Sequence, residues 1–109
     1  MLRPDHSFKD FAVDQLGALP DLRVKAMFGG HGLYQGERFF GILMKGRLYF
    51  KTDEATRSAY VDRGMAPFIY EKARRTMTLN YFEVPAEVLE DREQLVAWAN
   101  HAINAARER

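Results

Sequence analysis

The sequence contains no cysteine, which excludes disulfide bonds, cysteine-ligated zinc sites and thiol nucleophiles. It also lacks an apolar run near the roughly 18 residues of a membrane-spanning helix, and Asp5 and Asp10 interrupt the stretch where a secretory signal would be apolar. We therefore expect a soluble cytoplasmic protein without a membrane partner. No charge of one sign dominates, because 16 basic residues face 15 acidic ones, and this balance argues against binding driven mainly by nucleic-acid phosphates.

What the sequence does contain is enough apolar material for one core, since 47% of the 109 residues are hydrophobic. We expect a single domain over residues 1–109. Apolar spacing predicts helices over Ser7–Leu19 and from Asp91 onward, and Asp53 and Gly64 are typical of the two ends of a middle helix over Asp53–Arg63. Strands are predicted at Leu22–Met27, Leu33–Gln35, Arg38–Met44, Arg47–Thr52, Pro67–Glu71 and Thr76–Val84, with a helical turn at Ala86–Leu89. This order predicts a two-layer α+β fold with a mainly antiparallel sheet of about five or six strands.

The third and fourth of these strands carry apolar residues on both faces, although a sheet covered by helices on one side alternates apolar with polar residues. Either the three helices of the chain cover both faces, or a second copy of the chain covers one of them. We favour the second interpretation, a homodimer or another protein partner. The candidate dimer or partner face comprises Phe39, Phe40, Ile42, Met44 and Tyr49.

The glycine-rich segment Gly29, Gly30, His31, Gly32 is the most unusual local sequence. Consecutive amides there could form an anion-binding nest, together with a basic turn at Arg74 and Arg75. A structural turn or bulge is the favoured alternative, because the segment leads into a strand and lacks the spacing of phosphate-binding loops.

Catalytic and metal-binding patterns are missing from the sequence. The histidines have no metal-ligand spacing, and neither serine, Ser7 nor Ser58, stands in a nucleophile elbow. We therefore expect no catalytic residue, no metal and no cofactor.

Basic residues concentrate in the middle of the chain, where residues 23–81 hold eleven basic and five acidic side chains. Weak DNA binding by this segment is a further alternative, but Arg47 and Leu48 stand where the RNP1 motif of RNA-binding sheets requires an aromatic residue and then glycine or alanine. Nucleic acid is thus a partner that we do not favour.

Five segments taken together resemble one known family. They are Met27–Tyr34, Gly46–Lys51, Pro67–Lys72, Thr76–Pro85 and Leu95–Ala99, and their order and spacing are similar to those of the N-terminal domain of the TfoX/Sxy proteins, regulators of natural competence in bacteria. The resemblance covers nearly the whole chain. It implies a two-layer α+β domain with an antiparallel sheet and no recognised catalytic residue or cofactor.

The leading hypothesis is therefore a non-catalytic protein-interaction module, an accessory of competence or transcription regulators. Its rivals are a domain that binds a small anionic ligand at Gly29–Gly32, and weak DNA binding.

Overall fold

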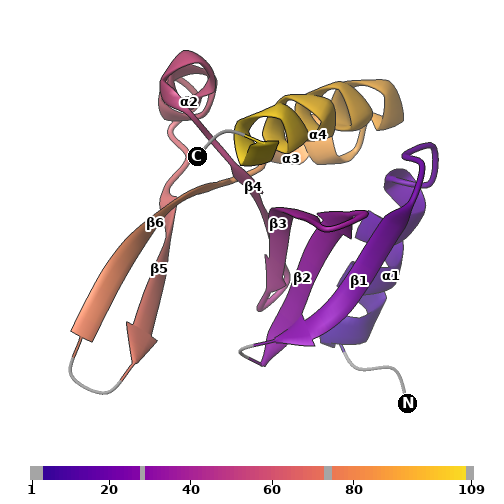
Figure 1. Ribbon diagram of the computed structural model, residues 1–109, viewed down its shortest axis with the longest axis horizontal. Coiled ribbons are helices and arrows are strands. Elements are labelled where there is room, and N and C mark those ends of the chain that lie inside the picture. The colour runs from indigo at the N-terminus through magenta and orange to yellow at the C-terminus, as the bar shows by residue number, and fades with distance from the viewer. Residues whose placement is uncertain (1–3, 28, 73–74, 108–109) are drawn as a thin grey trace.

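A computed structural model describes residues 4–27, 29–72 and 75–107, with only the backbone described for residues 4–6, 72 and 75–79 (Figure 1). All six strands form one antiparallel sheet in the order β1-β2-β3-β4-β6-β5, which confirms the predicted α+β fold. Within the described residues, no helix has the length and apolar character needed to cross a membrane. The elements are α1 (Pro4–Gln15), β1 (Leu22–Met27), β2 (Gly30–Gln35), β3 (Arg38–Met44), β4 (Arg47–Lys51), α2 (Glu54–Val61), β5 (Pro67–Lys72), β6 (Arg75–Glu83), α3 (Ala86–Leu89) and α4 (Arg92–Arg107).

The first helix is displaced from its predicted range. It begins at Pro4, a residue that suits the first turn because it needs no intrahelical N–H bond there, and it ends at Gln15 instead of Leu19. The chain then turns, and the Leu19 amide donates to the Leu16 carbonyl at 3.0 Å. Both leucines remain buried, so the apolar spacing identified core residues beyond the end of the helix.

The main core lies between the sheet and the helices α1, α3 and α4. The apolar stripe of α4 is buried as predicted, and α4 packs on β3 and β4. A hydrogen bond of 3.0 Å from the Gln15 side-chain amide to the Leu89 carbonyl ties the end of α1 to α3. The fully buried large side chains of this core are Leu16, Leu33, Phe40, Leu48, Phe50, Val88 and Leu95.

A β-bulge in β3 decides which residues of the predicted apolar run lie on each face of the sheet. Tyr34 pairs with Phe39 and Leu33 pairs with Gly41, so Phe40 is an extra residue without a partner in β2. Phe40 lies on the helix side, where it is 0% exposed and its ring lies 5.8 Å from that of Phe50. The extra residue reverses the alternation after it and so places Ile42 on the opposite face. The expected five-residue partner face is corrected accordingly, because Phe40 belongs to the main core.

Helix α2 begins as the sequence predicts. Asp53 is the N-cap: its carboxylate accepts the Thr56 amide at 3.0 Å, and its own amide donates to the Thr56 hydroxyl at 3.0 Å. This reciprocal pair is a capping box with threonine in the third position. Gly64 follows the helix with φ of 75°, the left-handed conformation that favours glycine.

Replacing Asp53 with alanine should lower the free energy of unfolding by about 1 kcal/mol, because the first turn of α2 loses its cap. Asparagine keeps the acceptor oxygen, and Asp53→Asn should lose less. The hydrogen bonds from Thr56 hold the pKa of Asp53 below its ordinary value of 3.8, so the stabilisation is present above that pH and disappears as the pH falls through the lowered pKa. Urea unfolding of the three proteins, at neutral pH and again well below pH 3.8, measures both effects. Equal losses for alanine and asparagine would contradict the capping role.

Candidate functional site

The sheet face that is turned away from the main core carries a second apolar cluster. Ile42, Phe68 and Tyr81 form its buried centre, and Ile42 is 0% exposed. None of the described helical residues belongs to this cluster. We call it the aromatic cluster, and it consists of Phe39, Ile42, Met44, Tyr49, Phe68, Tyr70 and Tyr81.

The rings of the aromatic cluster pack in the geometries that aromatic pairs prefer. The Phe39 ring lies 5.3 Å from that of Tyr81 and stacks at 5.0 Å on Tyr34 next to the cluster, while Tyr49 meets Phe68 edge-on at 5.0 Å. The Tyr81 hydroxyl donates to the Phe39 carbonyl at 3.3 Å. Burial raises the pKa of Tyr81, so this hydroxyl stays protonated and acts as a structural donor.

The hairpin of β5 and β6 supplies part of this cluster because the sheet bends where the two strands begin to pair. Pro67 pairs with Phe82 and Ile69 with Thr78, so between these pairs β6 has more residues than β5. In Figure 1 the hairpin projects away from β1, β2 and β3. The bend places Phe68 against Tyr49, and the far face is therefore covered in part by the chain itself.

A cleft of about 600 Å³ opens beside the cluster, between the turn that joins β3 to β4 and strand β5. Met44, Tyr49 and Tyr70, all partly buried, line it. Its rim carries both charges: Arg47 forms an ion pair with Glu83 at 2.9 Å, and Lys45 and Glu71 also line the opening. Burial, followed by the nearby Glu83 carboxylate, raises the pKa of Tyr49. Partly buried aromatic side chains and a mixed-charge rim are typical of protein-binding surfaces.

The sequence predicted a turn or bulge over the glycine segment, and the structure places only its first residue in the turn. Only Gly29 lies in the loop, with φ of 82°, whereas Gly30, His31 and Gly32 are part of β2. Glycine is needed at Gly30 because a Cβ there would meet the Leu43 carbonyl oxygen of the backbone, whereas a Cβ at Gly32 would meet the sulfur of the flexible Met27 side chain. The neighbouring hollow holds about 30 Å³, room for a water molecule and little more.

The basic turn expected to complete an anion site lies elsewhere. Arg75 begins β6, whose hairpin forms the edge of the sheet opposite β1, and Arg74 lies outside the described residues. The candidate residues Gly29, Gly30, His31 and Gly32 thus belong to one end of the sheet order and Arg75 to the other. In the part of the chain that the structure describes, no three histidine or carboxylate side chains gather as metal ligands do.

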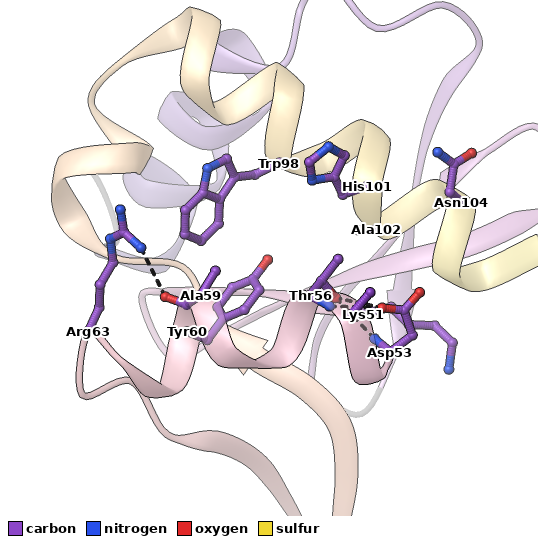
Figure 2. A pocket seen from close by; sticks show the side chains of 11 residues that line it. Lys51, Asp53, Thr56, Ala59, Tyr60, Arg63, Trp98, His101, Ala102 and Asn104 are labelled. Atoms are coloured by element: carbon purple, nitrogen blue, oxygen red, sulfur yellow. Dashed lines mark hydrogen bonds between the residues drawn. The ribbon is translucent and has the colours of Figure 1, made fainter.

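A second hollow, of about 620 Å³, lies between α2 and α4 and was not predicted (Figure 2). Tyr60 from α2 and Trp98 from α4 form one end of it, their rings 4.9 Å apart and edge-on. The helical spacing of both residues marks them as inward-facing, but the sequence does not say that these two helices lie side by side. We call this hollow the interhelical groove.

Comparison with known proteins places the chain in one family. The family model described as the TfoX N-terminal domain matches residues 14–106. The chain is similar to Protein Sxy of Escherichia coli strain K12, with 25% identity over 93 residues that cover 85% of this chain and 44% of that protein. It is also similar to DNA transformation protein TfoX1 of Aliivibrio fischeri, with 32% identity over 60 residues, 55% of this chain and 29% of that protein.

The chain therefore spans less than half the length of both relatives. Since the family match includes the whole sheet and most of the helices, the chain belongs to the TfoX N-terminal domain family.

Proposed function

We propose that this domain is a non-catalytic protein-interaction module of the kind used by competence and transcription regulators, and that it associates with a second copy of itself through the aromatic cluster and its cleft. The family and the name of one relative, a DNA transformation protein, support the regulatory part of the proposal. The supporting observation for the interaction is that Phe39, Met44, Tyr49 and Tyr70 remain partly exposed in a cluster to which no described helical residue belongs.

A second copy is the occupant that suits this face. Aromatic side chains and methionine are enriched in protein interfaces, and two-fold dimers are the commonest oligomers. The mixed rim of Lys45, Arg47, Glu71 and Glu83 is self-complementary, because the same patch offers both charges to its symmetry mate. A surface that carries both positively and negatively charged side chains can pair with a copy of itself without placing like charges opposite each other.

Changing Tyr49 to glutamine should weaken the dimer by about tenfold or more, because the interface loses a large aromatic contact at its centre. Glutamine adds no charge beside Glu83, and so it disturbs the fold of the monomer less than an acidic residue would. Sedimentation equilibrium at micromolar concentration gives the dissociation constants of both proteins.

The matched control is Val61→Gln, which also replaces an apolar residue with glutamine. Val61 is 53% exposed on α2 and does not belong to the aromatic cluster, so this variant should dimerise as the unchanged protein does. An unchanged protein that remains monomeric throughout the micromolar range would overturn the dimer, and so would equal weakening by the two variants.

DNA binding receives less support from this face. Lys25 lies over the Tyr34 ring at 4.9 Å and Lys51 over the Tyr81 ring at 5.3 Å, so both lysines already have an attractive partner. Arg47 is held by Glu83. These contacts compete with phosphate for the basic side chains, which is why we prefer a protein partner to a polyanion.

A further inference from the structure

The cleft beside the aromatic cluster runs along one edge of the sheet. Five consecutive residues of β5, Pro67–Glu71, line the cleft, and none of the described β6 residues does. Because successive side chains of a strand point to opposite faces, a cleft bordered by a continuous run of residues lies along the edge of the strand. β5 is the last strand of the sheet order and pairs with β6 on its other side. The cleft therefore opens onto the edge of β5 that has no strand beside it in the described residues.

This edge of β5 is less protected than the opposite edge of the sheet. Backbone N–H and C=O groups of an edge strand can pair with another strand, and charged side chains within the strand oppose such pairing. β1, the other edge strand, carries exposed Arg23 and Lys25. The middle of β5 holds Ile69 instead, which is 53% exposed, and the charged residues of β5 stand at its end. β5 is thus the edge to which a further strand can be added.

The other residues that line the cleft offer apolar contacts to an added strand. Met44 and Tyr49 are partly buried members of the aromatic cluster, and β5 contributes Phe68 and Tyr70 to the same cluster. An added strand would direct alternate side chains toward this cluster and its backbone toward β5. Extended segments bind by strand addition in this way, with main-chain hydrogen bonds along an edge and side-chain contacts at every second residue.

From this arrangement we infer that the strand added at this edge is β5 of a second copy, which pairs antiparallel with β5 about a two-fold axis at Ile69. The inference rests on the proposed dimer and specifies how its two copies meet. In this register Phe68 of each copy stands opposite Tyr70 of the other on the cluster side, and the two Ile69 side chains stand opposite each other on the other side. Aromatic and apolar cross-strand pairs stabilise the pairing, and the two six-stranded sheets become one.

The charges of the cleft favour a second copy in this register. Lys45 and Glu71 both line the cleft, but neither forms an ion pair with a described residue. β4 pairs with β6 near the residues where β5 begins, and β4 leads back from there to the turn that holds Lys45. Lys45 therefore lies on the side of Pro67, at the start of β5, whereas Glu71 lies near its end. Two-fold pairing brings Glu71 of the second copy opposite Pro67, so charges that are unpaired within one copy are complementary between two.

The absence of cysteine from the sequence allows a direct test, because a single introduced cysteine can form a disulfide only with another copy. Ile69→Cys places a thiol on the proposed two-fold axis. Directly opposite residues of antiparallel strands have Cα atoms about 4.5–5.5 Å apart, within the roughly 4.4–6.8 Å that a disulfide spans. The control is Val61→Cys, because Val61 is also 53% exposed but lies on α2. With oxidised glutathione at micromolar protein concentration, Ile69→Cys should form the linked dimer at least about tenfold faster, since the dimer holds its two thiols at a high effective concentration. Non-reducing gel electrophoresis measures both rates.

Sedimentation of the unchanged protein and of the reduced variants at the same concentration separates the two ways in which this test can fail. Equal rates of cross-linking by two variants that sediment as dimers would overturn the pairing of β5 and leave the proposed dimer in place. An unchanged protein that sediments as a monomer would overturn both.

Glu71→Gln and Lys45→Gln test the register. Each should raise the dissociation constant of the dimer about threefold, the size expected for an exposed ion pair. The double variant should be weakened no more than either single variant, because both changes remove the same pair. Glu87→Gln is the control, since Glu87 is an exposed carboxylate that pairs with Arg63 outside the cleft, and it should dimerise as the unchanged protein does. Single variants that dimerise as tightly as the control, or a double variant in which the two losses add, would overturn the register.

Discussion

Phe40→Ala is expected to lower the free energy of unfolding by about 3–5 kcal/mol, which is a large part of the stability of a domain of this size. Phe40 is 0% exposed, and its ring packs beside that of Phe50 in the main core. Removing it leaves a cavity between the sheet and α4 that the surrounding side chains fill only in part. Urea denaturation measures this loss. An unchanged dependence of the free energy of unfolding on urea concentration verifies that both proteins unfold in two states.

The adjacent residue is the matched control, because Phe39 and Phe40 are identical in chemistry and differ in the face that they occupy. Phe39 is partly exposed on the aromatic cluster, so Phe39→Ala should cost only about 1–2 kcal/mol. The hydrogen bond that the Phe39 carbonyl accepts from Tyr81 survives the change, since it uses the backbone. Similar losses for the two variants would contradict the placement of Phe39 and Phe40 on opposite faces of the sheet.

This pair of residues also shows where prediction from the sequence ends. Apolar residues on both faces of β3 were correctly expected from the run between Phe39 and Met44, because period-two alternation is visible in the sequence. The sequence could not assign each residue to a face, since one unpaired residue reverses the alternation after it. The position of the unpaired residue depends on how β2 and β3 pair, and the sequence of β3 alone does not determine this pairing.

Local signals were the more reliable ones. The cap of α2 at Asp53, the left-handed glycine at Gly64 and the buried stripe of α4 depend on residues within a few positions of each other, and the structure confirms all three. The end of α1 was predicted less well because Leu16 and Leu19 are buried whether or not the backbone around them is helical. Apolar spacing therefore predicts which side chains are buried, but it does not predict where the helical hydrogen bonds of the backbone end.

Both candidate surfaces depend on contacts between segments that are distant in the sequence. The cleft requires the β5–β6 hairpin to bend until Phe68 reaches Tyr49, and the interhelical groove requires Tyr60 to meet Trp98. Helical spacing does identify Tyr60 and Trp98 as inward-facing. Which of them meet, and what space they leave, follows from tertiary packing alone.

The second large effect is expected at Gly30, where alanine should lower the free energy of unfolding by about 3 kcal/mol, near the upper end of the cost of overpacking. The cause is steric, because Gly30 is not among the glycines with positive φ, and the added Cβ would run into the Leu43 carbonyl oxygen. That oxygen belongs to the backbone of β3, so relief requires β2 and β3 to separate. Thermal unfolding of Gly30→Ala, together with hydrogen exchange of the β2 and β3 amides, measures the loss and its location.

Gly32→Ala is the control, two residues further along the same strand. Its Cβ would meet the sulfur of Met27, and a methionine side chain can rotate away. The alanine also restricts the unfolded chain, which contributes about 0.4–1 kcal/mol of stability and offsets part of the crowding. We therefore expect a net loss below about 1 kcal/mol for Gly32→Ala. Equal losses at the two positions would show that the Leu43 carbonyl oxygen does not crowd position 30 more than the Met27 side chain crowds position 32. The placement of Gly30 in β2 beside β3 would then be wrong.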